Sequence, residues 1–198
     1  MNRLEPDEFI VPDVWQDKTA TLVNAKRWSK IELPENTTKV AVVQAQNYGE
    51  ALECYDILHY HHGYQKIAFS YGADWYVEEM FPHPNPLVGK MMGRIMVISK
   101  LYESKTITDS HRVHLLGCAL PQEFGYYADF PFIESVDTSN PIIHGLQGVK
   151  YNSLGLLTKS PTKIDQIEEE ITTERLYDIN HNIIRFKNFI KDSNTQLY

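Results

Sequence analysis

This sequence of 198 residues has few cysteines, no long apolar run and no excess of basic side chains. Its two cysteines, Cys54 and Cys118, are too few for a disulfide framework or a zinc site built from several thiolates. No apolar stretch is long enough to span a membrane, and the first residues lack the apolar core of a secretory signal. The formal net charge of −7 gives no overall basic footprint for nucleic acid. We therefore expect a soluble, cytoplasmic protein with no membrane partner.

The length and the 42% content of hydrophobic residues suffice for one buried core. We therefore expect a single domain over residues 1–198. A complete eight-fold α/β barrel usually needs about 250 residues, so a barrel of this length would be abbreviated.

Short apolar runs, closed by glycine, proline or polar clusters, alternate with stretches of helical spacing along most of the chain. This alternation predicts an α/β fold with parallel strands, which at this length is an abbreviated or partial TIM-like βα barrel. The predicted strands are residues 9–11, 39–43, 66–69, 113–116 and 132–136. The predicted helices are residues 19–30, 49–62, 93–103, 163–171 and 174–191, with a short helix between the last two strands.

Two regions interrupt this rhythm. Residues 75–89 include FPHPNPLVG, whose three closely spaced prolines predict a loop, as a lid or an insertion. After Pro141 the pattern weakens, so that residues 142–143 and 154–157 fit either strands or buried loop. Residues 163–198 are expected to close the chain as C-terminal helices.

A polar or glycine turn follows each predicted strand. In chain order these turns contain Asp13, Gln44, Gly72, Gly117 and Asp137. Because the carboxyl ends of parallel strands lie on one face, the five turns should converge, and this face is where α/β proteins place their sites. The sequence thus predicts a functional site built from these turns.

Several of these segments resemble a known family. The order VPD, VVQ, GYQKIAFSYG, HLLGCALP, ESVDTS and HNIIRFKNFI is similar to the second half of the tRNA-guanine transglycosylase family. The similarity is closer to its DNA-directed relatives, which insert 7-deazaguanine bases into phage or bacterial DNA. It covers most of residues 7–191, and its specificity lies in six short motifs that occur in the right order.

The resemblance implies a TIM barrel that exchanges a guanine in nucleic acid for a deazapurine through an aspartyl intermediate. It places Asp13 where a carboxylate binds the base edge, Gln44 at the glutamine of the family's VQG-like turn, Gly72 where a backbone group contacts the base, and Leu116 where an apolar residue stacks on it. Gly117, next to Leu116, is included in the same base-binding set. The nucleophile would be Asp137 or Glu134, because the acidic residue beyond that strand aligns either way. The expected partners are a guanine or deazapurine base and DNA or tRNA, with no cofactor.

The chain also departs from the family pattern. The first barrel strands and their general-base aspartate have no counterpart, and DTSNP replaces the arginine-bearing PTR sequence. His181 resembles the family's zinc histidine, but the three cysteine partners are absent, so we expect no metal. A homo-oligomer or a partner chain that completes the barrel would explain the missing strands.

Simpler readings stay open for the same residues. Asp13 and Asp137 are also suited to capping the helices that follow strands. Arg94 is among the few basic residues that could contact phosphate, and His114 could line the barrel interior. The alternatives to a base-exchanging pentosyltransferase are a non-catalytic partner subunit or base-binding module, and an unrelated enzyme of the nucleoside-hydrolase kind.

Overall fold

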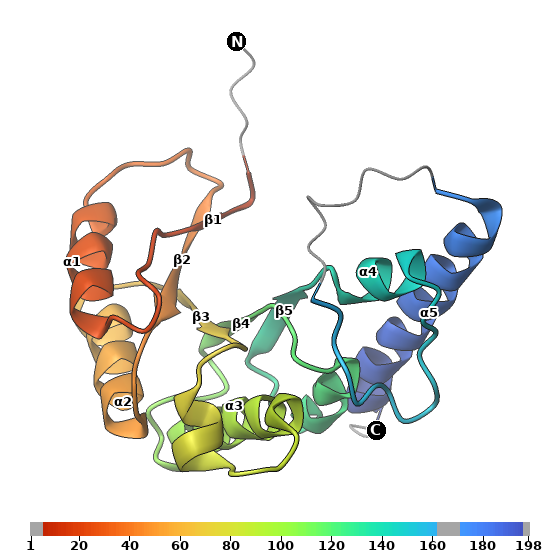
Figure 1. Ribbon diagram of the computed structural model, residues 1–198. Helices are drawn as coiled ribbons and strands as arrows, with labels where there is room; N and C mark the ends of the chain where they lie inside the picture. Colours follow the sequence, from red (N-terminus) through yellow and green to blue (C-terminus); the bar gives the residue numbers. More distant parts are fainter. Residues whose placement is uncertain (1–5, 162–170, 196–198) are drawn as a thin grey trace.

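The computed structural model of the protein describes residues 6–161 and 171–195. Five strands form one all-parallel sheet in the order β1-β2-β3-β4-β5, which curls into a half-barrel (Figure 1). The strands are β1 (Glu8–Ile10), β2 (Thr38–Val43), β3 (Lys66–Ser70), β4 (Arg112–Leu116) and β5 (Ile133–Asp137). The predicted α/β fold with parallel strands is confirmed, and the observed bounds of each strand differ from the predicted ones by about one residue.

Helices follow the strands and cover the outer face of the sheet (Figure 1). The α-helices are α1 (Lys18–Ser29), α2 (Tyr48–Asp56), α3 (Pro86–Glu103), α4 (Asn140–Leu146) and α5 (Thr173–Thr195). Asp17, Asn47 and Asn85 begin the first three helices, because each side chain accepts a hydrogen bond from an otherwise unpaired amide of the first turn. Two π-helices (Ile57–His61 and Tyr76–Met80) and a 3-10 helix (Pro121–Tyr127) complete the covering layer.

The two faces of the sheet carry different apolar clusters, because side chains alternate along each strand. On the outer face, Ala41, Val43, Ile67 and Phe69 belong to the large core formed with the helices, and Tyr55 of α2 stacks on Phe69. A small separate cluster lies on the inner face. Its members are Val40, Val42 and Ala68, with Leu116 packed against them.

A buried cation links the two edge strands near the amino end of the half-barrel. Lys66 Nζ lies 2.5 Å from Glu8 Oε1 on β1 and 3.3 Å from Glu134 Oε2 on β5, and the Lys66 side chain is 0% exposed. Arg112 also holds Glu134, at 2.6 and 2.9 Å. Since one ammonium group on the central strand contacts carboxylates of both edges, β1 and β5 turn toward each other over β3, which stabilises the curl.

A β-bulge in β5 explains how two acidic residues of one strand face the inside. Val113 pairs with Ile133, but the next residue, His114, pairs with Ser135, so that Glu134 is the extra residue. The regular alternation of inward-facing and outward-facing side chains along β5 is interrupted at Glu134. Glu134 contacts Lys66 near the amino end of the sheet. After the bulge, Ser135 pairs with His114 and Asp137 pairs with Leu116, so Asp137 also faces inward.

The proline-rich segment differs from the prediction. Instead of one loop over residues 75–89, Tyr76–Met80 forms a π-helix and α3 already begins at Pro86. Proline suits the first turn of a helix, because the amide that it lacks would be unpaired there, and Asn85 caps this turn. Residues 142–143 form part of α4, not a strand. The predicted helix at 163–171 lies almost entirely outside the described residues.

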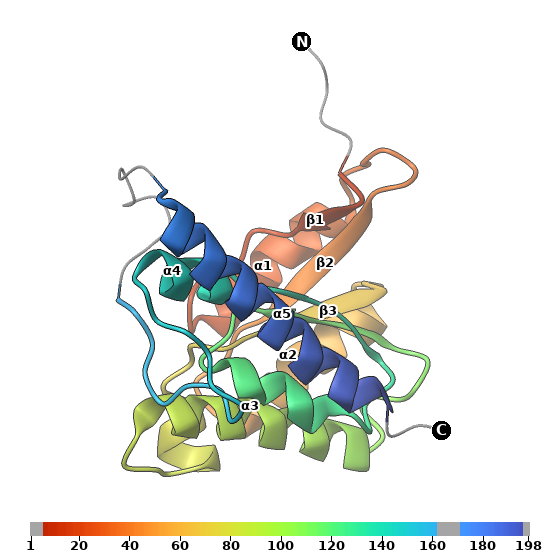
Figure 2. The same cartoon turned by 90° about the vertical axis from the view of Figure 1, so that its right-hand side faces the viewer.

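The long helix α5 packs alongside α4 and the 3-10 helix (Figure 2). A methyl group on Gly145 of α4 would lie 2.5 Å from the Ile179 Cα atom, so only glycine permits this close crossing. Asn182 of α5 accepts from the Tyr151 amide and donates to the Val149 carbonyl, which fixes the intervening segment. Over the described part of the chain, no helix is both long and apolar enough to cross a membrane.

The charged group at the amino end predicts a specific acid sensitivity. The hydrogen bond from Arg112, aided by the charges of Lys66 and Arg112, lowers the pKa of Glu134 to about 2. Its ionised form therefore stabilises the fold above the ordinary glutamate pKa, and this contribution disappears as the pH falls toward 2. Replacing Glu134 with glutamine should lower the free energy of unfolding at neutral pH and flatten its decline between about pH 4.5 and 2.

Urea unfolding at a series of pH values measures this effect. Glu32→Gln, at an exposed position between α1 and β2, is the control and should keep the wild-type pH dependence. An unchanged acid limb in Glu134→Gln would show that the ion pairs at the amino end do not contribute to stability.

Candidate active site at the carboxyl ends of the strands

The five turns that follow the strands meet in one continuous row of contacts, here called the carboxyl rim: residues 13–16, 44–46, 71–74, 116–117 and 137. The first contact joins β1 to β2. Gln44 Nε2 donates to Asp13 Oδ2 at 2.5 Å, and Gln44 Oε1 accepts from the Gln16 amide at 2.9 Å. Gln44 is buried and Asp13 is exposed, so the pair presents the carboxylate to solvent from a fixed support.

Trp15 connects the first turn to the third. A methyl group on Gly72 would lie 2.8 Å from Trp15 Cη2, so the indole ring packs directly on the glycine backbone. Trp15 nevertheless remains 53% exposed. The turn that presents it contains Gln16 at φ 53°, a left-handed conformation that non-glycine residues rarely adopt. Gln44 and Gln46 hold this turn through the Gln16 amide and carbonyl.

Tyr71 and Gly117 connect the third turn to the fourth and fifth. Gly117 has φ +62°, and a methyl group on it would lie 2.5 Å from Tyr71 Cδ1, so both the backbone angle and the ring require glycine there. The Gly117 amide donates to Asp137 Oδ1 at 2.8 Å. The row of contacts therefore runs unbroken from Asp13 to Asp137.

Asp137 is an accessible acidic group at the end of this row, held by contacts from His114 and Gly117. Its side chain is 63% exposed, and His114 Nε2 lies 3.4 Å from Oδ1, the same oxygen that the Gly117 amide binds. The hydrogen bond from His114 lowers the pKa of Asp137, and the Gly117 amide acts in the same direction, against the effect of burial. At neutral pH the group is a carboxylate with one oxygen fixed.

Glu134 occupies a different position from Asp137. It lies near the amino end of β5, where Arg112 holds both of its oxygens and Lys66 contacts one of them. A carboxylate with two cations attached is a poor nucleophile, because attack would require breaking these ion pairs. Of the two alternatives that the sequence left open, the geometry favours Asp137.

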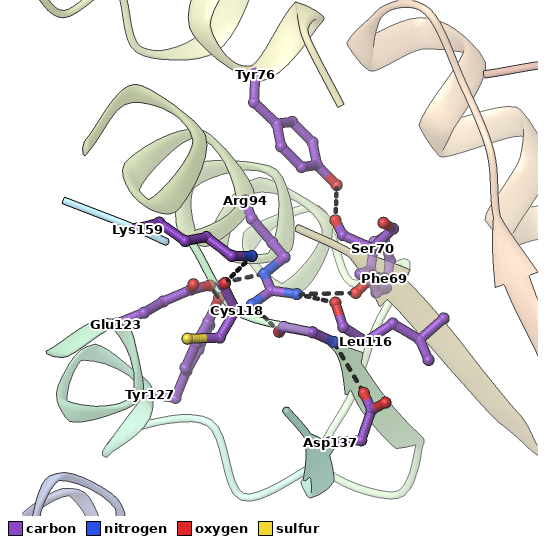
Figure 3. Close-up of polar contacts among 11 residues, drawn as sticks. Phe69, Ser70, Tyr76, Arg94, Leu116, Cys118, Glu123, Tyr127, Asp137 and Lys159 are labelled. Carbon is purple, nitrogen blue, oxygen red and sulfur yellow. Dashed lines mark hydrogen bonds and ion pairs between the residues drawn. The ribbon is translucent and has the colours of Figure 1, made fainter. Parts of the chain in front are cut away.

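A fully buried arginine fixes the ends of the central strands (Figure 3). Arg94 of α3 donates to the carbonyls of Phe69, Leu116 and Gly117 at 3.0–3.1 Å, and to Glu123 Oε1 at 2.7 Å. Glu123 is also fully buried and accepts from the Tyr127 hydroxyl at 2.8 Å. One guanidinium thus ties α3 and the 3-10 helix to the carboxyl ends of β3 and β4.

The structure corrects the expectation that Arg94 could contact phosphate, because its side chain is 0% exposed. The position of Arg94 in the sequence already indicates that its side chain is buried. Arg94 lies three residues after Met91 and four before Ile98, on the apolar stripe of α3, where a basic residue must find partners inside the protein.

Two further groups of the rim region lie close to Gly117. Lys159 Nζ donates to the Cys118 carbonyl at 2.8 Å and lies 3.6 Å from the centre of the Tyr71 ring, which places a positive charge beside the rim. Burial raises the pKa of the Cys118 thiol to about 12, so this cysteine is an unreactive core residue.

Two histidines that the sequence offers as metal ligands contact backbone carbonyls instead. His59 Nδ1 lies 2.9 Å from the Tyr64 carbonyl oxygen, and His181 Nε2 lies 3.0 Å from that of Tyr151. Within residues 6–161 and 171–195, no group of three or more histidine, cysteine, aspartate or glutamate side chains is arranged to hold a metal ion.

A cavity of about 410 Å³ lies at the opposite, amino-terminal end of the strands. The charged groups that line it include Lys39 and Arg112. Both are already engaged, since Lys39 Nζ donates to the carbonyls that end α1 and Arg112 binds Glu134. We therefore place the candidate site at the carboxyl rim, where Asp137 and Asp13 remain exposed.

The sequence identified the acidic and glycine members of the rim, and the structure adds Trp15, Tyr71 and the contacts of His114. Trp15 and Tyr71 each come within two residues of a predicted site residue, Asp13 or Gly72. An aromatic residue next to a polar strand-end turn was therefore the available signal for a ring-binding surface.

Comparison with known proteins adds no assignment. No family model matches the chain, and no curated protein matches it. What the rim can do chemically therefore follows from its own groups. It offers an ionised, accessible carboxylate at Asp137, a carboxylate–amide pair at Asp13 and Gln44, and exposed aromatic surface at Trp15.

The Arg94 contacts predict a large effect on stability. Replacing Arg94 with methionine should lower the free energy of unfolding by about 3–5 kcal/mol, because it leaves the Glu123 carboxylate buried without its cation. Lys90→Met on the same helix is a matched control. Lys90 is partly exposed and binds Asp74 and the Gly72 carbonyl, so its loss should cost only about 1–2 kcal/mol. Urea unfolding of both variants measures the difference, and equal losses would show that Arg94 has no special role.

Proposed function

We propose that this protein is a base-exchanging pentosyltransferase that replaces guanine in DNA or tRNA by a 7-deazaguanine through a covalent aspartyl intermediate. The observation that carries the proposal is the Asp137 carboxylate, which is 63% exposed and held at one oxygen on the same rim as Asp13 and Gln44. The motif order that resembles the transglycosylases supports the same assignment.

In the first step, the free oxygen of Asp137 attacks C1′ of the nucleotide and the bond from C1′ to guanine breaks. The electron pair leaves with guanine, which takes up a proton. In the second step the incoming deazapurine attacks C1′, loses a proton and displaces the carboxylate. Carboxylates perform this kind of displacement at sugar carbons, where the transition state resembles an oxocarbenium ion.

Asp13 and Gln44 provide the groups that a guanine edge requires. A carboxylate accepts from ring and exocyclic N–H groups, and an amide satisfies a carbonyl. In the free protein these two side chains bind each other, so a base must replace part of that bond. This exchange favours specificity, because an analogue without the matching groups leaves a polar pair unsatisfied.

A second candidate function is a non-catalytic, base-binding subunit that works with another chain. The observation that favours it is the half-barrel itself: among the described residues no sixth strand pairs with β1 or β5, so both edges offer unpaired backbone groups. A second copy or a partner chain that completes the barrel would cover these edges. Sedimentation of the purified protein, alone and with candidate partners, determines which arrangement occurs.

Replacement of labelled guanine in DNA and in tRNA tests the enzymatic proposal. Asp137→Asn should reduce exchange by more than about a thousandfold, because the amide is not a nucleophile. Asp13→Asn should weaken binding of the free base roughly tenfold to hundredfold, the range for one hydrogen bond to a charged group. Asp17→Asn is the matched control, since asparagine caps α1 as well as aspartate does.

Two results would overturn the proposal. One is the absence of exchange on both nucleic acids together with no binding of guanine or 7-deazaguanine at millimolar concentration. The other is full exchange activity in Asp137→Asn. Base binding without exchange, and without a covalent adduct in denaturing gels, would assign the protein to the binding-subunit alternative.

A further inference from the structure

His114 lies between two inward-facing groups of β5. It is on β4, only 6% exposed, and its two ring nitrogens contact different side chains. Nδ1 lies 2.7 Å from Ser135 Oγ, and Nε2 lies 3.4 Å from Asp137 Oδ1. The β-bulge at Glu134 brings Ser135 opposite His114, so all three residues lie side by side on the inner face.

The chemistry of the three groups decides the direction of the hydrogen bonds. An ionised carboxylate only accepts, so the hydrogen of a neutral imidazole must be on Nε2 for His114 to bind Asp137. Nδ1 then carries a lone pair and accepts from the Ser135 hydroxyl. The carboxylate thus fixes the tautomer, and the Ser135 hydroxyl, which can donate or accept, holds the ring by donating to Nδ1.

Both external contacts of the carboxylate fall on the same oxygen. The Gly117 amide donates to Asp137 Oδ1 at 2.8 Å, and the imidazole approaches that oxygen from β4. Two contacts on Oδ1 restrict how the carboxylate can turn, while the side chain as a whole remains 63% exposed. The separation of 3.4 Å is at the long end for a hydrogen bond, and such contacts commonly tighten when a substrate binds.

We propose that His114 and Ser135 are positioning residues that orient the Asp137 carboxylate for nucleophilic attack. This inference rests on the proposed function, and it assigns a role to two residues whose contacts the sequence did not predict. Neither residue needs to touch the substrate. They act through Asp137, in the way that a buried carboxylate orients the histidine of a hydrolase triad.

Two variants of His114 distinguish the effect of its hydrogen-bond donor from the effect of its packing. His114→Gln places an amide donor near the position of Nε2, whereas His114→Leu fills the space and removes the donor. We expect a roughly tenfold to hundredfold lower exchange rate in His114→Leu, the range for one hydrogen bond to a charged group, and partial rescue in His114→Gln. Ser135→Ala should fall between them, because the ring keeps its contact with Asp137 but loses the hydrogen bond that holds Nδ1.

A second readout distinguishes orientation from general loss of structure. The acidic limb of the exchange rate reports protonation of Asp137, whose pKa the His114 hydrogen bond lowers. In His114→Leu this limb should therefore move to higher pH. His61→Gln, at an exposed helix end beside Asp56, is the control and should leave both the rate and the limb unchanged.

Carbon-13 NMR titration of the Asp137 carboxyl group makes the test independent of activity. If the pKa of Asp137 rises in His114→Leu but the wild type performs no exchange, the proposed function fails and the positioning contact stands. If the wild type performs exchange and His114→Leu changes neither the rate, the acidic limb nor the titration, the positioning role is overturned.

Discussion

The ion pair between Arg94 and Glu123 is the interaction on which the candidate site depends. Arg94 joins α3, the 3-10 helix and the ends of β3 and β4 at one point, because it binds Glu123 and the carbonyls of Phe69, Leu116 and Gly117. One of these belongs to Gly117, whose amide binds Asp137 on its other side. A buried pair of this kind adds little net stability, because removing both charges from water is costly. Its contribution is geometric: it fixes one arrangement of the rim.

A second buried cation has the corresponding role at the other end of the half-barrel. Lys66 binds Glu8 and Glu134 from the two edge strands, so the curvature of the sheet has an internal cause. Between the two ends, Val40, Val42 and Ala68 form a thin apolar layer on the inner face. The inner face is therefore arranged in levels, charged at the amino end, apolar in the middle and polar at the rim. On the inner face, the candidate site therefore lies at one end and the ion pairs of Lys66 at the other.

The sequence predicted the strands well because each is a short apolar run closed by a turn, as in residues 39–43. It also predicted which turns would meet, since parallel strands bring their carboxyl ends together. Other features depend on tertiary contacts that no local pattern contains. The bulge that separates Glu134 from Asp137 is a matter of register between strands, and the contact of Trp15 with Gly72 joins turns far apart in the chain. The sequence pattern does not reveal the start of α3 at Pro86, because proline favours both loops and the first turn of a helix.

The order of the strands in the sheet has a consequence for synthesis. Each strand pairs with the one that precedes it in the chain, so every new strand can join a sheet that already exists when it leaves the ribosome. The two buried cations, in contrast, each pair with a carboxylate that lies later in the chain. Arg94 is synthesised before its partner Glu123, and Lys66 is synthesised before Glu134, which lies on the last strand. Arg94 therefore gains its carboxylate only when the 3-10 helix has been made, whereas Lys66 can pair with Glu8 as soon as β3 forms and gains its second carboxylate when β5 closes the curl.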